Sequence, residues 1–139
     1  SLEFCKYVTV WWDPYFLDIE DLLTIFNACV GWDINIKEFA LVGERIINVE
    51  KAFNTRLGLS KKDDVMPERF YSEPSNSGPH KGEVMSREGF NKMLDEYYET
   101  RGWDKESGLL TKEKLIELGL QDVADKLGSK ISEQSNEKV

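Results

Sequence analysis

The two cysteines, Cys5 and Cys29, are the residues of this chain best suited to metal chemistry. Thiolates bind zinc and iron–sulfur clusters, and a cluster normally takes four of them. The chain offers only these two, and neither belongs to a Cys-x-x-Cys pair. From the residues alone, Cys5 is more often a small buried hydrophobe than a ligand. Cys29 shares a predicted apolar helix face with Phe26 and Val30, which favours a place in the core.

The other chemically capable residues favour structural roles. His80 is the single histidine and has no neighbouring Cys or His, so we expect it to be solvated or part of an interface. Asp63 and Asp64 could form a catalytic carboxylate pair. Their position just before Pro67 favours capping and turn formation instead. The sequence contains no glycine-rich phosphate loop.

The composition is that of an ordinary soluble globular protein. Among 139 residues, 40% are hydrophobic and 12% aromatic, too many for a disordered chain. The net charge of −8 argues against a nucleic-acid surface. No apolar run reaches the roughly 20 residues of a membrane helix, and the start lacks a secretory signal pattern. Two cysteines are too few for a disulfide scaffold, so we expect a cytoplasmic location.

Helix signals dominate the chain, and they predict an irregular all-α fold of five or six helices. Asp18 and Gly31 are suitable first and last residues for one helix. Asn35 and Glu38 resemble a capping box that opens a longer helix over residues 36–56, around which the others are expected to pack. The core stripe predicted for the long helix comprises Phe39, Val42, Ile46, Val49 and Phe53, widened by Ile36, Ala40 and Ile47.

Glycines carry further information about packing and turns. Gly43, in the middle of the long helix, predicts the close approach of a neighbouring helix. Gly31-Trp32-Asp33 and Gly102-Trp103-Asp104 each follow a predicted helix. We interpret both as one local solution, in which Gly is left-handed and Trp packs back on the last helical turn.

The second half of the chain combines a long polar loop with shorter helices. Residues 60–81 hold three of the four prolines and predict a loop with one helical turn at residues 67–71. Helices are then expected from Ser86 to Gly102, from Thr111 to Leu118, and over 120–127. We expect a helical domain over residues 1–128 and a polar tail over 129–139.

Several spaced motifs carry a family resemblance over residues 1–127. They include Arg45, Asn48, Glu50, Phe53, Asn54, Arg56, Gly58, Lys62-Asp63-Asp64, Pro67-Glu68-Arg69-Phe70, Leu94-Asp95-Glu96-Tyr97-Tyr98, Arg101-Gly102-Trp103-Asp104, Lys114-Leu115 and Leu118-Gly119-Leu120. Together they resemble the C-terminal part of the tungsten-containing aldehyde ferredoxin oxidoreductases. The chain is accordingly expected to be a fragment of a larger multidomain enzyme.

The resemblance implies two cofactor contacts near the start of the chain. In that family the cysteine of a D-x-x-G-L-C motif is the fourth ligand of a [4Fe–4S] cluster, and the residue before it contacts a pterin through its backbone. These roles fall on Cys5 and Phe4. Glu3 stands where the family has Gly, which puts a charged side chain at a place of close backbone approach. Trp11 and Trp12 follow closely and either shield the cluster or, as we favour, pack in the core.

By the same resemblance, the parent enzyme oxidises aldehydes to carboxylic acids at a tungsten (or molybdenum) bis-pterin centre. Electrons would leave through the cluster to ferredoxin, which we do not expect to dock mainly on this acidic segment. The family's catalytic Glu and His lie in upstream domains, so the isolated segment is expected to be inactive and free of cofactor. One alternative is a stand-alone helical interaction domain of the same ancestry that has lost its redox role, as Glu3 suggests. Another is a related enzyme for a different oxo-acid or aromatic compound.

Overall fold

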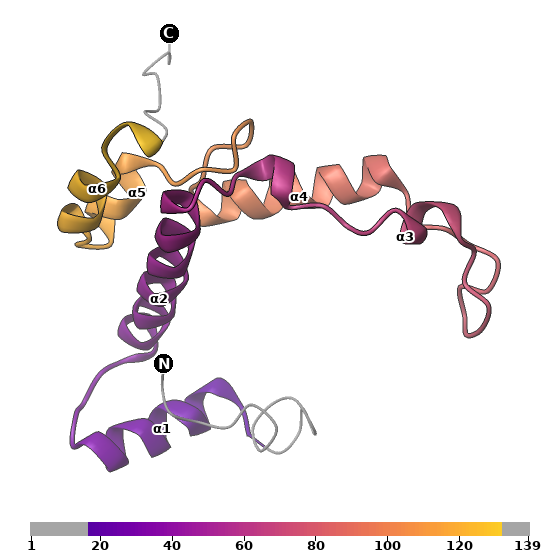
Figure 1. Cartoon of the computed structure of the whole chain (residues 1–139). Helices are drawn as coiled ribbons and strands as arrows, with labels where there is room; N and C mark the ends of the chain where they lie inside the picture. Colours follow the sequence, from indigo (N-terminus) through magenta and orange to yellow (C-terminus); the bar gives the residue numbers. More distant parts are fainter. Residues whose placement is uncertain (1–16, 132–139) are drawn as a thin grey trace, which may run out of the picture. The chain divides into compact units, whose positions relative to one another are not determined.

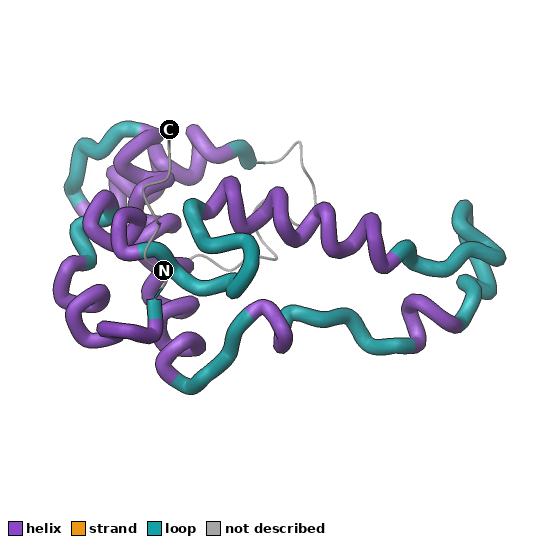
Figure 2. The backbone as a smooth tube through the Cα atoms, turned by 90° about the horizontal axis from the view of Figure 1, so that it is seen from above, coloured by secondary structure: helices purple, strands orange, loops and turns teal. Residues whose placement is uncertain are grey.

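The computed structural model describes residues 17–131, and all regular elements in that range are helical (Figures 1 and 2). The α-helices are α1 (Ile19–Val30), α2 (Ile36–Arg56), α3 (Arg69–Ser72), α4 (Arg87–Arg101), α5 (Lys112–Glu117) and α6 (Gln121–Leu127). Two short 3-10 helices, η2 (Lys61–Asp63) and η3 (Gly128–Lys130), accompany them. Trp103 and Leu110 form an isolated antiparallel bridge. The predicted all-α fold is confirmed.

The chain forms two compact units, residues 1–49 and 50–139, and α2 spans the division between them. The predicted boundary at residue 128 falls just after α6 and stays a prediction. Within residues 17–131, no helix is long and apolar enough to cross a membrane.

Capping in the first unit follows the sequence signals. The Asp18 carboxylate accepts hydrogen bonds from the backbone N–H groups of Glu20 and Asp21, at 2.9 Å each, and opens α1. Gly31 ends α1 with φ +70°, a left-handed conformation that glycine adopts without a Cβ penalty. The Asn27 side chain donates to the Ile34 carbonyl (2.9 Å), so the turn between α1 and α2 is held by a side chain that satisfies its backbone.

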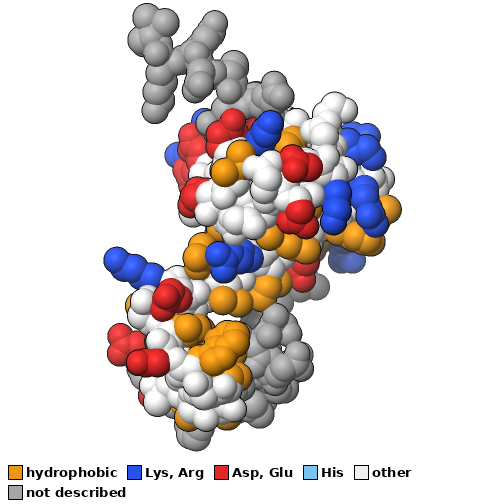
Figure 3. All heavy atoms as spheres, turned by 90° about the vertical axis from the view of Figure 1, so that its left-hand side faces the viewer, with side chains coloured by type: hydrophobic (Ala, Val, Ile, Leu, Met, Phe, Trp, Pro, Cys, Tyr) orange, Lys and Arg blue, Asp and Glu red, His pale blue; other side chains and the backbone are white. Residues whose placement is uncertain are grey.

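Aromatic contacts join α1 to the start of α2. The Phe26 ring lies 5.9 Å from Trp32 and 5.7 Å from Phe39, centroid to centroid, in edge-to-face geometry. Phe39 is buried, whereas α1 itself has no buried residue. Figure 3 accordingly shows hydrophobic side chains gathered at the surface over α1 and the turn after it.

Three predictions about burial are wrong in the described structure. Cys29 is exposed, because α1 packs through Phe26 and leaves its last turn uncovered. Within residues 17–131, a Cβ on Gly43 would meet nothing within 4 Å, so no described helix approaches it closely. Four residues expected in the core stripe are exposed, namely Ile36, Ala40, Val49 and Phe53.

The buried residues of the second unit come from the second half of α2, the end of α4 and the turn after it, and from α5 and α6, which contact each other. The buried apolar residues are Ala52, Tyr98, Trp103, Leu110, Leu115, Leu118, Ala124 and Leu127. The Thr111 hydroxyl donates to the Gly102 carbonyl (2.7 Å) and accepts from the Lys114 N–H (3.3 Å). One side chain therefore caps α5 and ties it to the end of α4.

The predicted polar loop contains two short helical elements. η2 lies at its start and α3 within it, two residues later than the turn expected from Pro67. Figures 1 and 2 show the chain running out from α2 to α3 and returning through α4.

Candidate functional site

The residues expected to contact cofactors lie outside the described part of the chain. Phe4 and Cys5, like Trp11 and Trp12, belong to residues 1–16. Between residues 17 and 131, no group of three or more His, Cys, Asp or Glu side chains is arranged to hold a metal ion. His80, expected to be solvated or part of an interface, is exposed with Nδ1 3.1 Å from Glu83 Oε2.

A cluster of charged and aromatic side chains, here called the Tyr98 cluster, is the most organised polar group of the second unit. It comprises Lys51, Lys61, Asp64, Asp95, Tyr98 and Trp103. The buried Tyr98 hydroxyl donates to Asp64 Oδ2 at 2.6 Å, and Lys51 Nζ lies 3.2 Å from the same oxygen. This carboxylate oxygen therefore joins α2, the segment after η2, and α4.

Aromatic faces surround the lysine of this arrangement. Lys51 Nζ lies 5.0 Å from the centroid of Trp103 and 5.7 Å from that of Tyr98. Its side chain is only 10% exposed. A charge so far removed from water needs both its carboxylate partner and the negative ring faces. The Lys51–Asp64 pair is accordingly part of the packing of the unit.

Lys61 makes a second set of contacts in the Tyr98 cluster. Its Nζ lies 2.6 Å from Asp95 Oδ1, donates to the Lys105 carbonyl at 2.8 Å, and stands 5.9 Å from the Tyr98 centroid. Its backbone N–H donates to the Ser107 carbonyl at 2.8 Å. The ion pair and hydrogen bonds of Lys61 thus connect η2 both to α4 and to the turn that follows α4.

The Tyr98 cluster has the features of a structural cluster and is poorly suited to acid–base catalysis. Burial, followed by the hydrogen bond to Asp64, raises the pKa of Tyr98 above its ordinary value. Near neutral pH the tyrosine therefore stays a neutral donor and does not act as a base. Because Tyr98 is 1% exposed, a substrate could not reach its hydroxyl.

The two adjacent carboxylates have different roles, only one of which the sequence predicts. Asp63 Oδ2 accepts from the Ser60 N–H at 2.9 Å, which confirms its role as a cap. Asp64 instead bonds Lys51 and Tyr98, which lie 13 and 34 residues away. Sequence reasoning missed this cluster because no local spacing signals such distant partners.

We expect Asp64→Ala to destabilise the second unit more than Asp63→Ala does. Loss of Asp64 leaves a buried lysine without its carboxylate and a buried hydroxyl without its acceptor, at about 2–3 kcal/mol. Loss of Asp63 removes one cap, at about 1 kcal/mol. Native-state hydrogen exchange of α4 amides in the full-length protein measures the difference. Equal loss of protection in the two variants would contradict the role assigned to Asp64.

The turn after α4 completes this region. Asp104 Oδ1 accepts from the Ser107 N–H at 2.8 Å, and the Gly108 N–H donates to the Asp104 carbonyl at 2.8 Å. Gly108 has φ +67°, and a Cβ there would stand 2.9 Å from the Tyr98 hydroxyl and 3.0 Å from the Lys61 nitrogen. Glycine is required at this position for both reasons.

An open hollow of about 520 Å³ lies beside α3. It is lined by Arg69, Phe70, Glu73, Pro74, Ser75, Asn76, His80, Glu83, Val84 and Met85. Its polar side chains contact one another, Arg69 with Glu73 (3.5 Å) and His80 Nδ1 with Glu83 Oε2 (3.1 Å). Mixed lining and internal pairing do not indicate a catalytic site.

Comparisons with known proteins supply the remaining evidence. Residues 1–120 match a family model described as aldehyde ferredoxin oxidoreductase, domains 2 and 3. A tungsten-containing aldehyde ferredoxin oxidoreductase of Pyrococcus horikoshii is 42% identical over 107 residues, 76% of this chain and 17% of that protein. Proteins of the same name from Pyrococcus furiosus and Thermococcus kodakarensis are 41% and 40% identical, with the same coverage. The chain thus matches about one sixth of the length of these relatives.

Proposed function

Because the chain belongs to the aldehyde ferredoxin oxidoreductase family, we propose that the full-length protein oxidises aldehydes to carboxylic acids and passes the electrons to ferredoxin. The family match over residues 1–120 carries this proposal. Since the matched stretch is 17% of the length of the curated relatives, the remaining domains of the same enzyme are its first partners.

The cofactors of this activity would be a tungsten (or molybdenum) bis-pterin centre and a [4Fe–4S] cluster. When bound, they would supply the redox chemistry, accepting two electrons from the aldehyde and passing them on singly. Cys5 and Phe4 lie outside the described residues, so their assignment depends on the family match over residues 1–120. In this proposal the Cys5 thiolate ligates the cluster and the Phe4 backbone contacts a pterin. Glu3, in place of the family glycine, stands next to that contact.

In this proposal the described helices of the second unit have a structural role. Residues that resemble the family motifs, including Asp64, Asp95 and Tyr98, are held together in the Tyr98 cluster. Their hydrogen bonds and ion pairs hold η2 against α4. We infer that these motif residues maintain the fold and do not touch substrate.

Expression of the full-length protein under anaerobic conditions with tungstate tests the proposal. We expect aldehyde-dependent reduction of ferredoxin, together with tungsten and iron in the purified protein. A stable full-length protein that holds neither metal and oxidises no aldehyde would support the alternative, a helical interaction domain without redox function. Glu3 favours this alternative, because the family has glycine at that position. If Glu3 is the cause of the lost redox role, the Glu3→Gly variant of the metal-free protein should bind metal again. Activity on other oxo-acids or aromatic compounds alone would indicate a different substrate class.

We expect ferredoxin to dock elsewhere on the full-length enzyme. The segment carries a net charge of −8, ferredoxins are typically acidic, and like charges slow encounter. Lys62→Glu and Lys112→Glu, at two exposed positions, should therefore leave the rate of ferredoxin reduction nearly unchanged. The rate with a small dye acceptor serves as the control. A several-fold, salt-dependent loss with ferredoxin alone would place the docking face on this segment.

A further inference from the structure

Residues 65–90, here called the arm, form internal hydrogen bonds and ring contacts but have no core of their own. None of these residues is buried. Fixing a residue in one backbone conformation costs about 1–2 kcal/mol in entropy, which folded segments normally offset by burying apolar surface. The arm therefore lacks, within the described part of the chain, the burial that would hold it in place.

The arm is nevertheless specifically structured. Ser75 and Glu83 are paired, with the Ser75 N–H donating to the Glu83 carbonyl at 2.9 Å. The Met85 N–H donates to the Phe70 carbonyl at 2.8 Å, and the Tyr71 and Phe90 rings meet edge to face at 6.4 Å. These contacts hold the backbone of the arm in one specific conformation.

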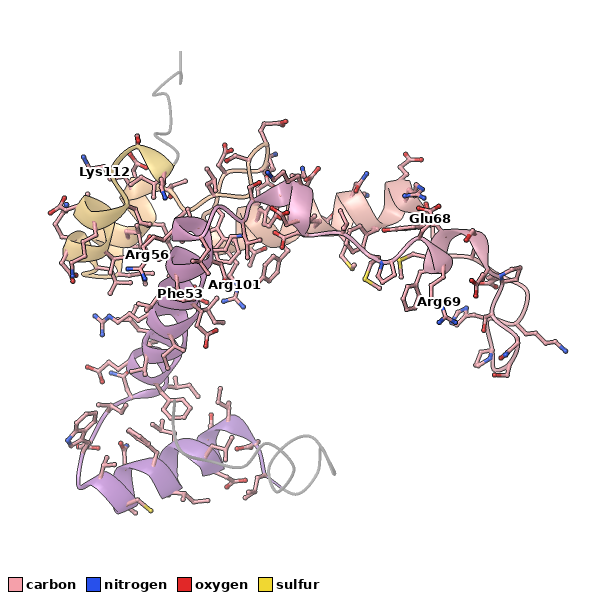
Figure 4. All side chains as sticks on the ribbon, viewed as in Figure 1. Phe53, Arg56, Glu68, Arg69, Arg101 and Lys112 are labelled. Carbon is pink, nitrogen blue, oxygen red and sulfur yellow. The ribbon has the colours of Figure 1, made fainter. Side chains whose placement is uncertain are left out.

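Charged groups of the arm are paired along its length. Arg87 binds the Glu68 carboxylate and also lies over the Tyr71 ring, 4.1 Å from its centroid. Figure 4 shows Glu68 and Arg69 on this segment, near α3 and the start of α4. With three Lys or Arg and four Glu, the arm has a net charge of −1 within a chain of −8. If another protein surface covered the arm, few charges of the arm would be buried without a partner of opposite charge.

Apolar side chains are exposed next to these pairs. Phe70, Val84 and Met85 line the hollow beside α3 and are 45%, 48% and 37% exposed. Met93, 59% exposed, does not line the hollow but lies one helical turn beyond Phe90, whose ring contacts Tyr71 of the arm. We call Phe70, Val84, Met85 and Met93 the arm face. Methionine and aromatic side chains are enriched in the centres of protein interfaces.

We propose that the arm face packs against another domain of the same polypeptide. Like the proposed function, this inference requires that the chain be part of a longer enzyme. The matched stretch is 17% of the length of the Pyrococcus horikoshii relative, so the other 83% lies outside it. A domain within that remaining part would cover the arm face. Ferredoxin fits this face poorly, because a transient redox partner needs complementary charge, whereas the arm face is apolar and the arm has a net charge of only −1.

Hydrogen exchange of the full-length protein tests this proposal. In the wild type, the amides of residues 68–90 should be protected. Met93→Glu should raise their exchange rates by about tenfold or more, because a buried charge opposes docking. Asn91→Glu is the matched control, since Asn91 is exposed on the same helix and lies outside the arm face. It should leave the exchange rates unchanged.

Three further outcomes separate the alternatives. If the amides of the arm exchange freely with solvent in the wild-type protein, the arm is not covered and the proposal is wrong. If light scattering shows that Met93→Glu halves the molecular mass, the arm face binds a second copy and the proposal is wrong. Aldehyde oxidation is measured separately. A protein with a protected arm but no such activity would contradict the proposed function and leave the docking of the arm supported.

Discussion

Replacing Cys5 with serine in the full-length protein is expected to remove most of the [4Fe–4S] cluster that we propose for it. Serine oxygen is a poor ligand for the soft iron–sulfide core, and a four-thiolate cluster that lacks one ligand loses stability. Loss of the cluster would interrupt electron flow to ferredoxin. Iron analysis and electron paramagnetic resonance of the anaerobically purified variant measure the effect directly.

Cys29→Ser is the matched control for this experiment. Cys29 is exposed on α1, so a serine there adds no buried hydroxyl and should leave cluster content and helix content unchanged. The expected contrast therefore separates ligation from any general effect of losing a thiol. Cluster content in Cys5→Ser equal to that of the wild type would refute the ligand role of Cys5.

Gly108→Ala is expected to produce the largest destabilisation among single-methyl substitutions in the second unit. An L-residue at φ +67° costs about 1–2 kcal/mol. The added Cβ would also stand 2.9 Å from the Tyr98 hydroxyl, inside the distance of real Cβ contacts. The side-chain and backbone shifts that accommodate such overpacking destabilise a protein by about a further 1–3 kcal/mol. Hydrogen exchange of α4 amides in the full-length protein should report the sum.

Gly31→Ala provides the comparison at nearly the same backbone angle. Gly31 has φ +70°, but a Cβ there would meet nothing within 4 Å. It should therefore show the backbone cost alone, measured on the amides of α1. If the two alanine variants lose the same amount of local stability, the contact between Gly108 and Tyr98 is not tight in solution.

Local sequence signals determined where the helices begin and end. Asp18 and Ser86 begin helices and Gly31 and Gly102 end them, as the structure confirms. A capping side chain bonds backbone groups two or three residues away, and a left-handed glycine depends on its own φ angle. Such interactions are complete within one turn of chain. The family, too, was identified from the order of short motifs in the sequence and is confirmed by the comparisons.

Which faces are buried was decided by the tertiary structure. Trp32 and Trp103 occupy the same local motif after a left-handed glycine, yet Trp32 is 60% exposed and Trp103 only 7%. On α2, Ala52 and Thr55 are buried while the more apolar Phe53 is exposed. Hydrophobic periodicity marks every face that could be covered, without stating which neighbour is present to cover it.

The Tyr98 cluster depends on tertiary structure most of all. Its central bond joins Asp64 to Tyr98 across 34 residues, and each residue taken alone resembles a turn former or a core aromatic. A carboxylate, an ammonium group and a phenol acquire their roles here only because folding places the Lys51 ammonium 3.2 Å and the Tyr98 hydroxyl 2.6 Å from the same Asp64 oxygen. The sequence by itself determined helices, caps and family. The choice of partner for each side chain required the packed chain, because burial and electrostatic pairing depend on distances in space that sequence spacing does not encode.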